Sequence, residues 1–301
     1  MELVKLKPIV KDYIWGGKYF QGFGKGLGLE RVSECWELSV RGLDSSIIAT
    51  GDNQGKQLNE VITKEDVGPI QDRFPYFPLL IKLIDAKENL SVQVHPSDEY
   101  ALKHENSFGK SEMWHIVSAN EGSGLYVGLN DNYTKEDIEK ALKEGNILGY
   151  LNFFKVKPGD TFIINPGTIH AIGAGVRLIE IQQNSNLTYR LYDYNRVDQN
   201  GNPRELHIKK ALKFINYQKY QQSKSNNDVL CDNQYFTVKE ITFDKELKIS
   251  ANEKSFVSFT FLEGEGLVNE IEYKQYDTFF LPFKKECVIK GKGKVVISTI
   301  R

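Results

Sequence analysis

Most of the chain alternates between apolar and polar residues, in short runs that end at Pro-Gly or Gly. Residues 153–172 (FFKVKPGDTFIINPGTIHAI) alternate with a period of two, and residues 175–185 (GVRLIEIQQNS) are rich in β-branched residues. Both patterns are typical of short β-strands bounded by turns. The pattern therefore predicts a scaffold built mainly from strands.

Helical spacing occurs in three places: residues 58–70 (LNEVITKEDVGPI), residues 134–151 (TKEDIEKALKEGNILGYL) and residues 205–217 (ELHIKKALKFINY). Thr134 is placed to cap the second helix, because a threonine hydroxyl can accept a hydrogen bond from the first helical turn. We expect these helices to be insertions that pack against the β scaffold. The predicted fold class is all-β with a few helices.

The composition changes after Tyr220 and divides the chain in two. Residues 221–228 (QQSKSNND) are polar and lack periodicity, as linkers do. Beyond them the pattern contains only strands. We predict one domain with helical insertions at residues 1–220 and a β domain at residues 221–301.

The two predicted domains share a short motif. Residues 157–172 and residues 274–291 each contain Asp-Thr-Phe, followed by an apolar run and a proline. In the second copy, Glu286 and Cys287 stand where the first copy has His170. This echo predicts two related β-barrels, of which the second is a degenerate copy.

Length and charge limit the classes of function. The 301 residues carry a formal net charge of −1, with 40% hydrophobic and 26% charged residues. This composition is that of a soluble globular protein with a sizeable core. It offers no basic surface for nucleic acid or an anionic membrane, so an anionic substrate must be held by a local group of lysines and arginines.

The first residues (MELVKLKPIVKDYIWGG) contain no apolar signal segment, and no run approaches the roughly 18 apolar residues of a spanning helix. The three cysteines, Cys35, Cys231 and Cys287, are scattered without CxxC spacing. We interpret them as reduced thiols and expect a cytoplasmic protein.

Four polar residues are candidates for a metal site. Gln93 and His95 lie on the same face of a predicted strand within residues 89–100 (NLSVQVHPSDEY), and polar groups on a core-facing side need partners. Glu112, just ahead of an apolar strand, and His170, after a Pro-Gly turn, can join them. Nitrogen and oxygen ligands without a thiolate suit a catalytic Zn²⁺ with an open position, ahead of Fe²⁺ or Mn²⁺.

Each of these residues also has a purely structural interpretation. A single histidine in a strand is commonly a hydrogen-bonded core residue, and Glu112 beside Lys110 can form an exposed ion pair. His104 and His207 lie in charged surroundings and are expected at the surface. The residues alone leave both interpretations open.

Residues 159–170 (GDTFIINPGTIH) resemble the second metal-binding motif of the cupins, which are jelly-roll barrels. Two glycines and His170 lie at the offsets of that motif, and Pro166 comes one position late. The first cupin motif has His-x-His followed closely by Glu. Here residues 93–95 (QVH) stand in its place, and a long insertion delays the carboxylate to Glu112.

Four ordered motifs together resemble the type I mannose-6-phosphate isomerases in their short bacterial form: LSVQVHPSD, GKSEMWHIV, PGTIHAIGAG and LIEIQQNSNLTYRLYDYNR. YIWGG and SECWELS are also similar to that family, and the match spans about residues 10–200. The resemblance implies a cupin-type jelly roll that interconverts mannose 6-phosphate and fructose 6-phosphate through a cis-enediol.

The resemblance also implies roles for individual residues. In the family, one zinc ion per chain is held by the residues that match Gln93, His95, Glu112 and His170. The arginine that matches Arg190 is assigned to catalysis. His115 departs from the family, where a tyrosine commonly follows the tryptophan. Either His115 enters the site, or it fills the packing position of that tyrosine.

Glu180, Arg190 and Lys110 are the candidate catalytic residues. Arg190 can stabilise an enediolate or bind phosphate, or it can simply pair with Asp193. Glu180 lies among apolar residues, which suggests a raised pKa suited to proton transfer, and it matches an acidic residue of the family. Alternatively, Glu180 forms a salt bridge to Arg177 or supports a ligand histidine.

Four residues are candidates to bind the substrate: Lys82, Ser91, Lys110 and Arg190. Lys82 is a cation in an otherwise apolar strand, and Ser91 shares the strand face of Gln93. Residues 21–28 (QGFGKGLG) fit neither a dinucleotide-binding motif nor a P-loop, and are predicted to form a flexible loop.

Two other functions are compatible with a cupin barrel. An iron dioxygenase is expected to keep a His-x-His pair, whereas Gln93 replaces the first histidine here. A non-catalytic sugar-phosphate sensor on the same barrel is disfavoured because the chain retains both motif histidines, Glu112 and Arg190. We therefore favour the isomerase, with a small sugar phosphate as its partner.

Overall fold

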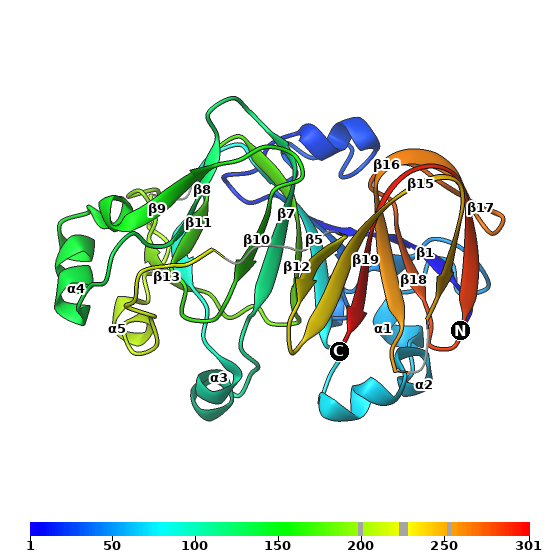
Figure 1. The fold of residues 1–301 in the computed structure, drawn as a ribbon, viewed down its shortest axis with the longest axis horizontal. Coiled ribbons are helices and arrows are strands. Elements are labelled where there is room, and N and C mark those ends of the chain that lie inside the picture. The colour runs from blue at the N-terminus through cyan, green and yellow to red at the C-terminus, as the bar shows by residue number, and fades with distance from the viewer. Residues whose placement is uncertain (198–200, 223–227, 252–253) are drawn as a thin grey trace.

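The structure is a computed structural model that describes residues 1–197, 201–222, 228–251 and 254–301. Strands dominate this part of the chain and form three sheets (Figure 1). The predicted all-β class with a few helices is confirmed.

Two of the sheets face each other and form a barrel. The six-stranded sheet contains, in spatial order, β10 (Thr161–Ile164), β7 (Glu112–Ala119), β12 (Val176–Gln183), β5 (Leu79–Ala86), β3 (Glu34–Leu38) and β2 (Ile9–Lys11). The five-stranded sheet contains β13 (Tyr189–Tyr192), β6 (Val92–Val94), β11 (His170–Ile172), β8 (Gly124–Leu129) and β9 (Leu151–Lys155). One apolar cluster joins Trp114 and Leu178 of the first sheet to Val127 and Ile172 of the second. The two inner faces therefore share one core, as in a jelly roll.

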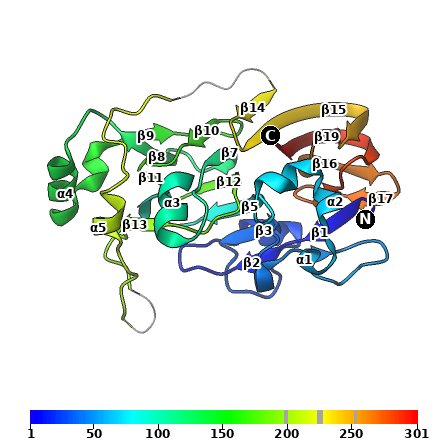
Figure 2. The same ribbon diagram turned by 90° about the horizontal axis from the view of Figure 1, so that it is seen from below.

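The third sheet is called the C-terminal sheet. Its eight strands are β14 (Val229–Asp232), β15 (Phe236–Ser250), β19 (Glu286–Ile300), β16 (Val257–Val268), β18 (Thr278–Leu281), β1 (Val4–Lys7) and β4 (Ile47–Ile48), with β17 (Ile271–Tyr273) on β16. Strand β1 pairs antiparallel with β18, with Leu6 opposite Thr278, and both termini lie on this side of the molecule (Figure 2). The division at residue 220 stays a prediction, because β1 joins strands from beyond it and residues 223–227 lie outside the described residues.

The C-terminal sheet packs against the outer face of the six-stranded sheet. One apolar cluster contains Ile81 and Met113 of the barrel together with Phe236 and Val238 of the C-terminal sheet. All four side chains are buried. Burial of apolar surface therefore holds the C-terminal sheet to the barrel.

The helices are short. The α-helices are α1 (Leu58–Val61), α2 (Lys64–Val67), α3 (Asp98–Glu105), α4 (Lys135–Lys143) and α5 (Ile208–Ala211), and the 3₁₀ turns are Tyr19–Phe23, Gly42–Asp44, Pro69–Arg73 and Ile147–Tyr150. Thr134 caps α4 as predicted, and its hydroxyl accepts a hydrogen bond from the Asp137 N–H at 3.1 Å. No described helix is long and apolar enough to span a membrane.

The other helical predictions were less accurate. Residues 58–70 form two separate turns, because a second capping box begins at Thr63. Residues 205–217 contain only the single turn α5. Helix α3 was not predicted, although Ser97 caps it by accepting a hydrogen bond from the Tyr100 N–H.

The repeated Asp-Thr-Phe motif encodes the same turn twice. The Lys157 N–H donates to Asp160 Oδ2 at 2.8 Å just before β10, and the Lys274 N–H donates to Asp277 Oδ2 at 2.9 Å just before β18. Each aspartate thereby closes a tight turn that starts a strand.

The glycine-spaced residues 21–28 are anchored to the core, in contrast to the predicted flexible loop. Lys25 is buried, and its ammonium lies 2.7 Å from Oε1 of the fully buried Glu37 on β3. Burial raises the pKa of Glu37, and the Lys25 ammonium opposes that shift. The loop therefore supplies the counter-charge for a carboxylate inside the protein.

Replacing Lys25 by methionine is expected to lower the free energy of unfolding by about 3–5 kcal/mol, because it leaves the Glu37 carboxylate buried without its counter-charge. Urea denaturation measures this change. The exposed Lys18 provides the matched control, and Lys18→Met should change stability by less than about 0.5 kcal/mol. Equal effects of the two substitutions would contradict the anchoring role.

Candidate metal centre and cavity

Strand geometry brings the four predicted metal ligands together. In the five-stranded sheet β6 and β11 pair antiparallel, so that Gln93 lies directly opposite His170. His95 follows β6 two residues after Gln93, on the same strand face. Glu112 begins β7 in the facing six-stranded sheet. The site therefore lies between the two sheets of the barrel.

The side-chain atoms converge on one point. His170 Nε2 lies 3.4 Å from Glu112 Oε1, and His95 Nε2 lies 3.6 Å from Glu112 Oε2. The candidate ligand atoms of these three residues lie within 4.8 Å of one another. The Gln93 amide is 3.4 Å from His170 Nε2, and rotation of that amide exchanges its nitrogen for its oxygen. All four residues are thus brought together.

Both histidines present a nitrogen lone pair to this point. His95 Nδ1 lies 2.8 Å from the Leu187 carbonyl, and His170 Nδ1 lies 2.9 Å from the Thr168 carbonyl. A carbonyl can only accept, so Nδ1 carries the proton in each ring and Nε2 carries the lone pair that can bind a metal. Burial lowers the pKa of His95 and lowers that of His170 to about 3, which keeps both rings neutral.

The residues present fit a divalent cation. Glu112 is fully buried, and its Oε1 has no hydrogen-bond partner among the described residues. Buried carboxylate oxygens are rarely left unsatisfied, and a cation among two imidazoles, a carboxylate and an amide would satisfy this one. Lys110 also faces the centre: its ammonium contacts Glu112 Oε2 and lies 3.2 Å from His95 Nε2.

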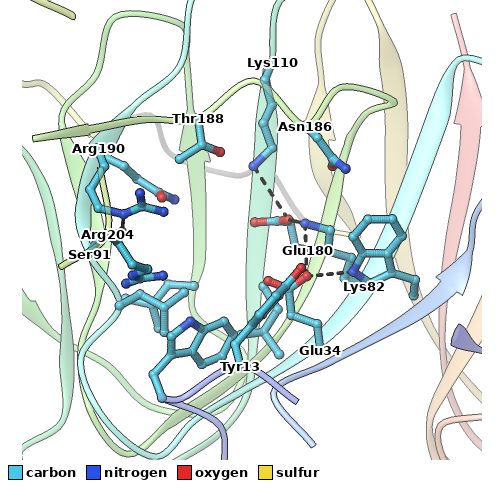
Figure 3. Close-up of a pocket in the computed structure, with 16 residues that line it drawn as sticks. Tyr13, Glu34, Lys82, Ser91, Lys110, Glu180, Asn186, Thr188, Arg190 and Arg204 are labelled. Carbon is cyan, nitrogen blue, oxygen red and sulfur yellow. Dashed lines mark hydrogen bonds and ion pairs between the residues drawn. The ribbon is translucent and has the colours of Figure 1, made fainter. Parts of the chain in front are cut away.

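A cavity of about 470 Å³ opens beside the centre (Figure 3). Gln93 and Lys110 belong to its lining. Ser91, Arg190 and Arg204 gather on one side, which we call the arginine end. Glu34, Lys82 and Glu180 gather opposite them, at the acidic end. Trp15 and Trp36 supply apolar surface.

Comparison with known proteins places the chain in a family. Residues 3–132 match the sequence profile "Phosphomannose isomerase type I, catalytic domain". The chain is 35% identical to "Mannose-6-phosphate isomerase ManA" of Bacillus subtilis over 97% of both chains. The chain belongs to the type I mannose-6-phosphate isomerases.

Solved structures agree with this family in fold. A crystal structure of the mannose 6-phosphate isomerase from Bacillus subtilis matches with a TM-score of 0.86 and 32% identity, over 99% of both chains. A mutant phosphomannose isomerase from Salmonella typhimurium matches over 100% of both chains with a TM-score of 0.79 at 15% identity, which shows the shared fold alone.

Glu180 lies beside two ammonium groups, whereas the sequence predicted apolar surroundings. Lys82 Nζ lies 3.1 Å and Lys110 Nζ 3.8 Å from its Oε1, and the Trp114 indole N–H donates to its Oε2 at 2.9 Å. Burial by itself raises the pKa of Glu180, but the two ammonium groups outweigh it and lower the pKa to about 2. The expectation of a raised pKa was wrong. The alternative salt bridge was wrong too, because Arg177 pairs with Asp85 at 3.0 Å.

The lysine candidates differ in their surroundings. Lys82 lies between two carboxylates, 3.1 Å from Glu180 and 3.4 Å from Glu34, at the acidic end of the cavity. These carboxylates raise the pKa of Lys82 although burial lowers it, so the ammonium stays charged. The contact of Lys82 with phosphate stays a prediction. Glu34 also lines the cavity, although the sequence had not indicated it.

At the arginine end, Ser91 and Arg190 were predicted to bind the substrate, whereas Arg204 was not. Arg190 Nε donates to Ser91 Oγ at 3.3 Å, and Arg190 Nη1 donates to the Glu205 carbonyl at 2.9 Å. The alternative pairing of Arg190 with Asp193 is not seen, because Arg204 binds both oxygens of that carboxylate at 2.6 and 2.7 Å. Nothing in the sequence pattern around Arg204 marked it as a cavity residue.

The remaining histidines are His104 and His207, which were expected at the surface, and His115, which departs from the family pattern. His207 is half-buried and its Nδ1 accepts a hydrogen bond from the Arg190 N–H at 3.2 Å, whereas His104 is exposed as expected. His115 does not enter the site. It is buried on the opposite side of β7, 2.9 Å from Thr161 Oγ1.

Proposed function

We propose that the protein interconverts mannose 6-phosphate and fructose 6-phosphate, with one zinc ion held by Gln93, His95, Glu112 and His170. The observation that carries this proposal is the convergence of two neutral imidazoles and a buried carboxylate beside a cavity with a cationic end. Family membership supports the reaction, and the donor set supports zinc. The free, buried thiols of Cys35, Cys231 and Cys287 support a cytoplasmic location.

The arginine end is suited to bind the phosphate. Arg190 presents a planar guanidinium that can bind two phosphate oxygens, and Arg204 adds a second permanent charge in the same part of the cavity. Ser91 already accepts a hydrogen bond from Arg190 and can donate its own hydroxyl proton to phosphate. Phosphate bound here would direct the rest of the sugar chain toward Lys110 and the acidic end of the cavity.

The centre and the acidic end are suited to move a proton between C1 and C2. A bound zinc ion supplies positive charge that stabilises negative charge on the substrate oxygens. Glu180 is ionised and lines the cavity, so it remains our candidate base, although the lysines that lower its pKa also weaken it as a proton acceptor. The ammonium groups of Lys82 and Lys110 are placed to stabilise an enediolate.

Metal removal tests the proposed function. Protein dialysed against a chelator is expected to lose nearly all isomerase activity in a coupled assay, and one equivalent of zinc per chain should restore it. Full activity in protein shown to be metal-free would overturn the zinc assignment. Zinc-loaded protein that binds mannose 6-phosphate without converting it would instead establish a sensor.

Replacing Glu180 by glutamine is expected to lower kcat by about 10²–10⁴-fold, the usual contribution of a general base, with a smaller change in KM. Because the pKa of Glu180 is about 2, the wild-type carboxylate is ionised from pH 5 to pH 8, and the loss should be the same across that range. Steady-state kinetics at several pH values measure this. A kcat within twofold of wild type would remove Glu180 from the mechanism.

A further inference from the structure

The strand that carries Glu112 has a second face, which contacts the C-terminal sheet. Residues of β7 alternate in direction, so Glu112 and Trp114 point into the barrel while Met113 and His115 point outward. Met113 joins the apolar cluster that contains Phe236 of the C-terminal sheet. The inner face of β7 therefore contributes to the metal centre, and its outer face contacts the C-terminal sheet.

His115 makes a polar contact with the C-terminal sheet on this outer face. Its Nε2 lies 2.9 Å from Glu240 Oε2, and its Nδ1 lies 2.9 Å from Thr161 Oγ1. A carboxylate beside Nε2 favours a proton on that nitrogen, and the Thr161 hydroxyl can then donate to Nδ1. The imidazole is only 2% exposed, so neighbouring groups on both sides fix its orientation.

Glu240 belongs to a long, continuously paired part of the C-terminal sheet. It lies on the 15-residue strand β15 and pairs with Val296 in a ladder that runs the whole length of β15 and β19 (Figure 1). The contact with His115 lowers the pKa of Glu240 and keeps its carboxylate charged. Lys294 lies 3.9 Å from its other oxygen.

We propose that His115 and Glu240 are a positioning pair, through which the C-terminal sheet holds β7 in register and so tightens metal binding at Glu112. This inference rests on the proposed metal site. Because His115 lies three residues along the same strand from Glu112, a shift of β7 moves the carboxylate relative to His95 and His170, which other strands carry. Ligand geometry depends on such supporting contacts.

The test measures zinc affinity by competition with a chromophoric chelator, on metal-free protein that circular dichroism shows to be folded. Glu240→Ala is expected to weaken zinc binding by roughly 3- to 30-fold, the range found for residues that couple to a site without touching its ligand. Glu240→Gln keeps an oxygen that can accept from His115 and should recover most of the affinity. The matched control is Glu263→Ala, because Glu263 also pairs with Lys294, at 3.3 Å, and makes no ion pair with β7.

A double-mutant cycle separates the pair from a general loss of stability. If the two residues act together, His115→Phe should weaken zinc binding as Glu240→Ala does, and the double variant should be no weaker than either. Unchanged zinc affinity in Glu240→Ala, or an equal loss in Glu263→Ala, would overturn the positioning role and leave the proposed isomerase intact. Wild-type protein that binds no zinc would overturn both.

Discussion

His170→Ala is expected to lose bound zinc and isomerase activity together. The substitution removes one of the four ligands and leaves Glu112 Oε1 without the neutral imidazole now 3.4 Å away. Loss of a supporting contact alone commonly costs 10- to 100-fold in metal affinity, so loss of a ligand should cost at least about 100-fold. Elemental analysis after dialysis and the coupled assay measure the two losses in the same sample.

The exposed His104 supplies the matched control for this experiment. His104→Ala removes an imidazole from helix α3 without touching the cavity, and should keep full zinc content and activity. A His170→Ala protein with wild-type zinc and wild-type turnover would refute the ligand assignment.

Arg190→Ala is expected to keep its zinc but to lose kcat/KM by roughly 10²–10⁴-fold. A guanidinium can only donate hydrogen bonds and is not a metal ligand, and that of Arg190 lies at the arginine end of the cavity beside Ser91. Two lost hydrogen bonds to a charged phosphate, each worth about 1.5–3 kcal/mol, account for the size of the effect. Steady-state kinetics with mannose 6-phosphate, together with zinc analysis, measure it.

Arg190→Lys tests whether charge or shape matters at this position. Lysine keeps the positive charge but cannot bind two oxygens with one planar group, so an intermediate loss is expected. If Arg190→Ala lost zinc in parallel with activity, or kept wild-type kcat/KM, Arg190 would not be the phosphate residue.

Local rules account for the parts of the structure that the sequence predicted well. Strand alternation places Gln93 and His95 on one face, and the turn after Pro166 delivers His170 to the start of β11. Thr134 caps α4 because capping depends on neighbours within one helical turn. These features involve residues close in sequence, so their pattern is visible in the chain itself.

Predictions were less accurate where they depended on charged residues that are distant in sequence but close in space. The sequence around Glu180 is apolar and suggested a raised pKa, yet Lys82 on β5 and Lys110, just before β7, lower it to about 2. Lys25 looked like part of a flexible loop until the fold placed Glu37 against it. An ionisable group responds to every charge within a few ångströms, and sequence order does not reveal which charges those are.

By itself the sequence determined the strand-rich class, the turns that begin β10 and β18, and the four residues that could bind a metal. Only the tertiary structure brought those four within reach of one another, placed Arg204 beside Arg190, joined β1 to the C-terminal sheet and turned His115 away from the cavity toward Glu240. The reason is that strand pattern and capping are set by neighbours along the chain. Pairing of strands and of charges is set by contacts between segments far apart in the chain, as Leu6 and Thr278 or His115 and Glu240 are, and these contacts form only when the sheets pack.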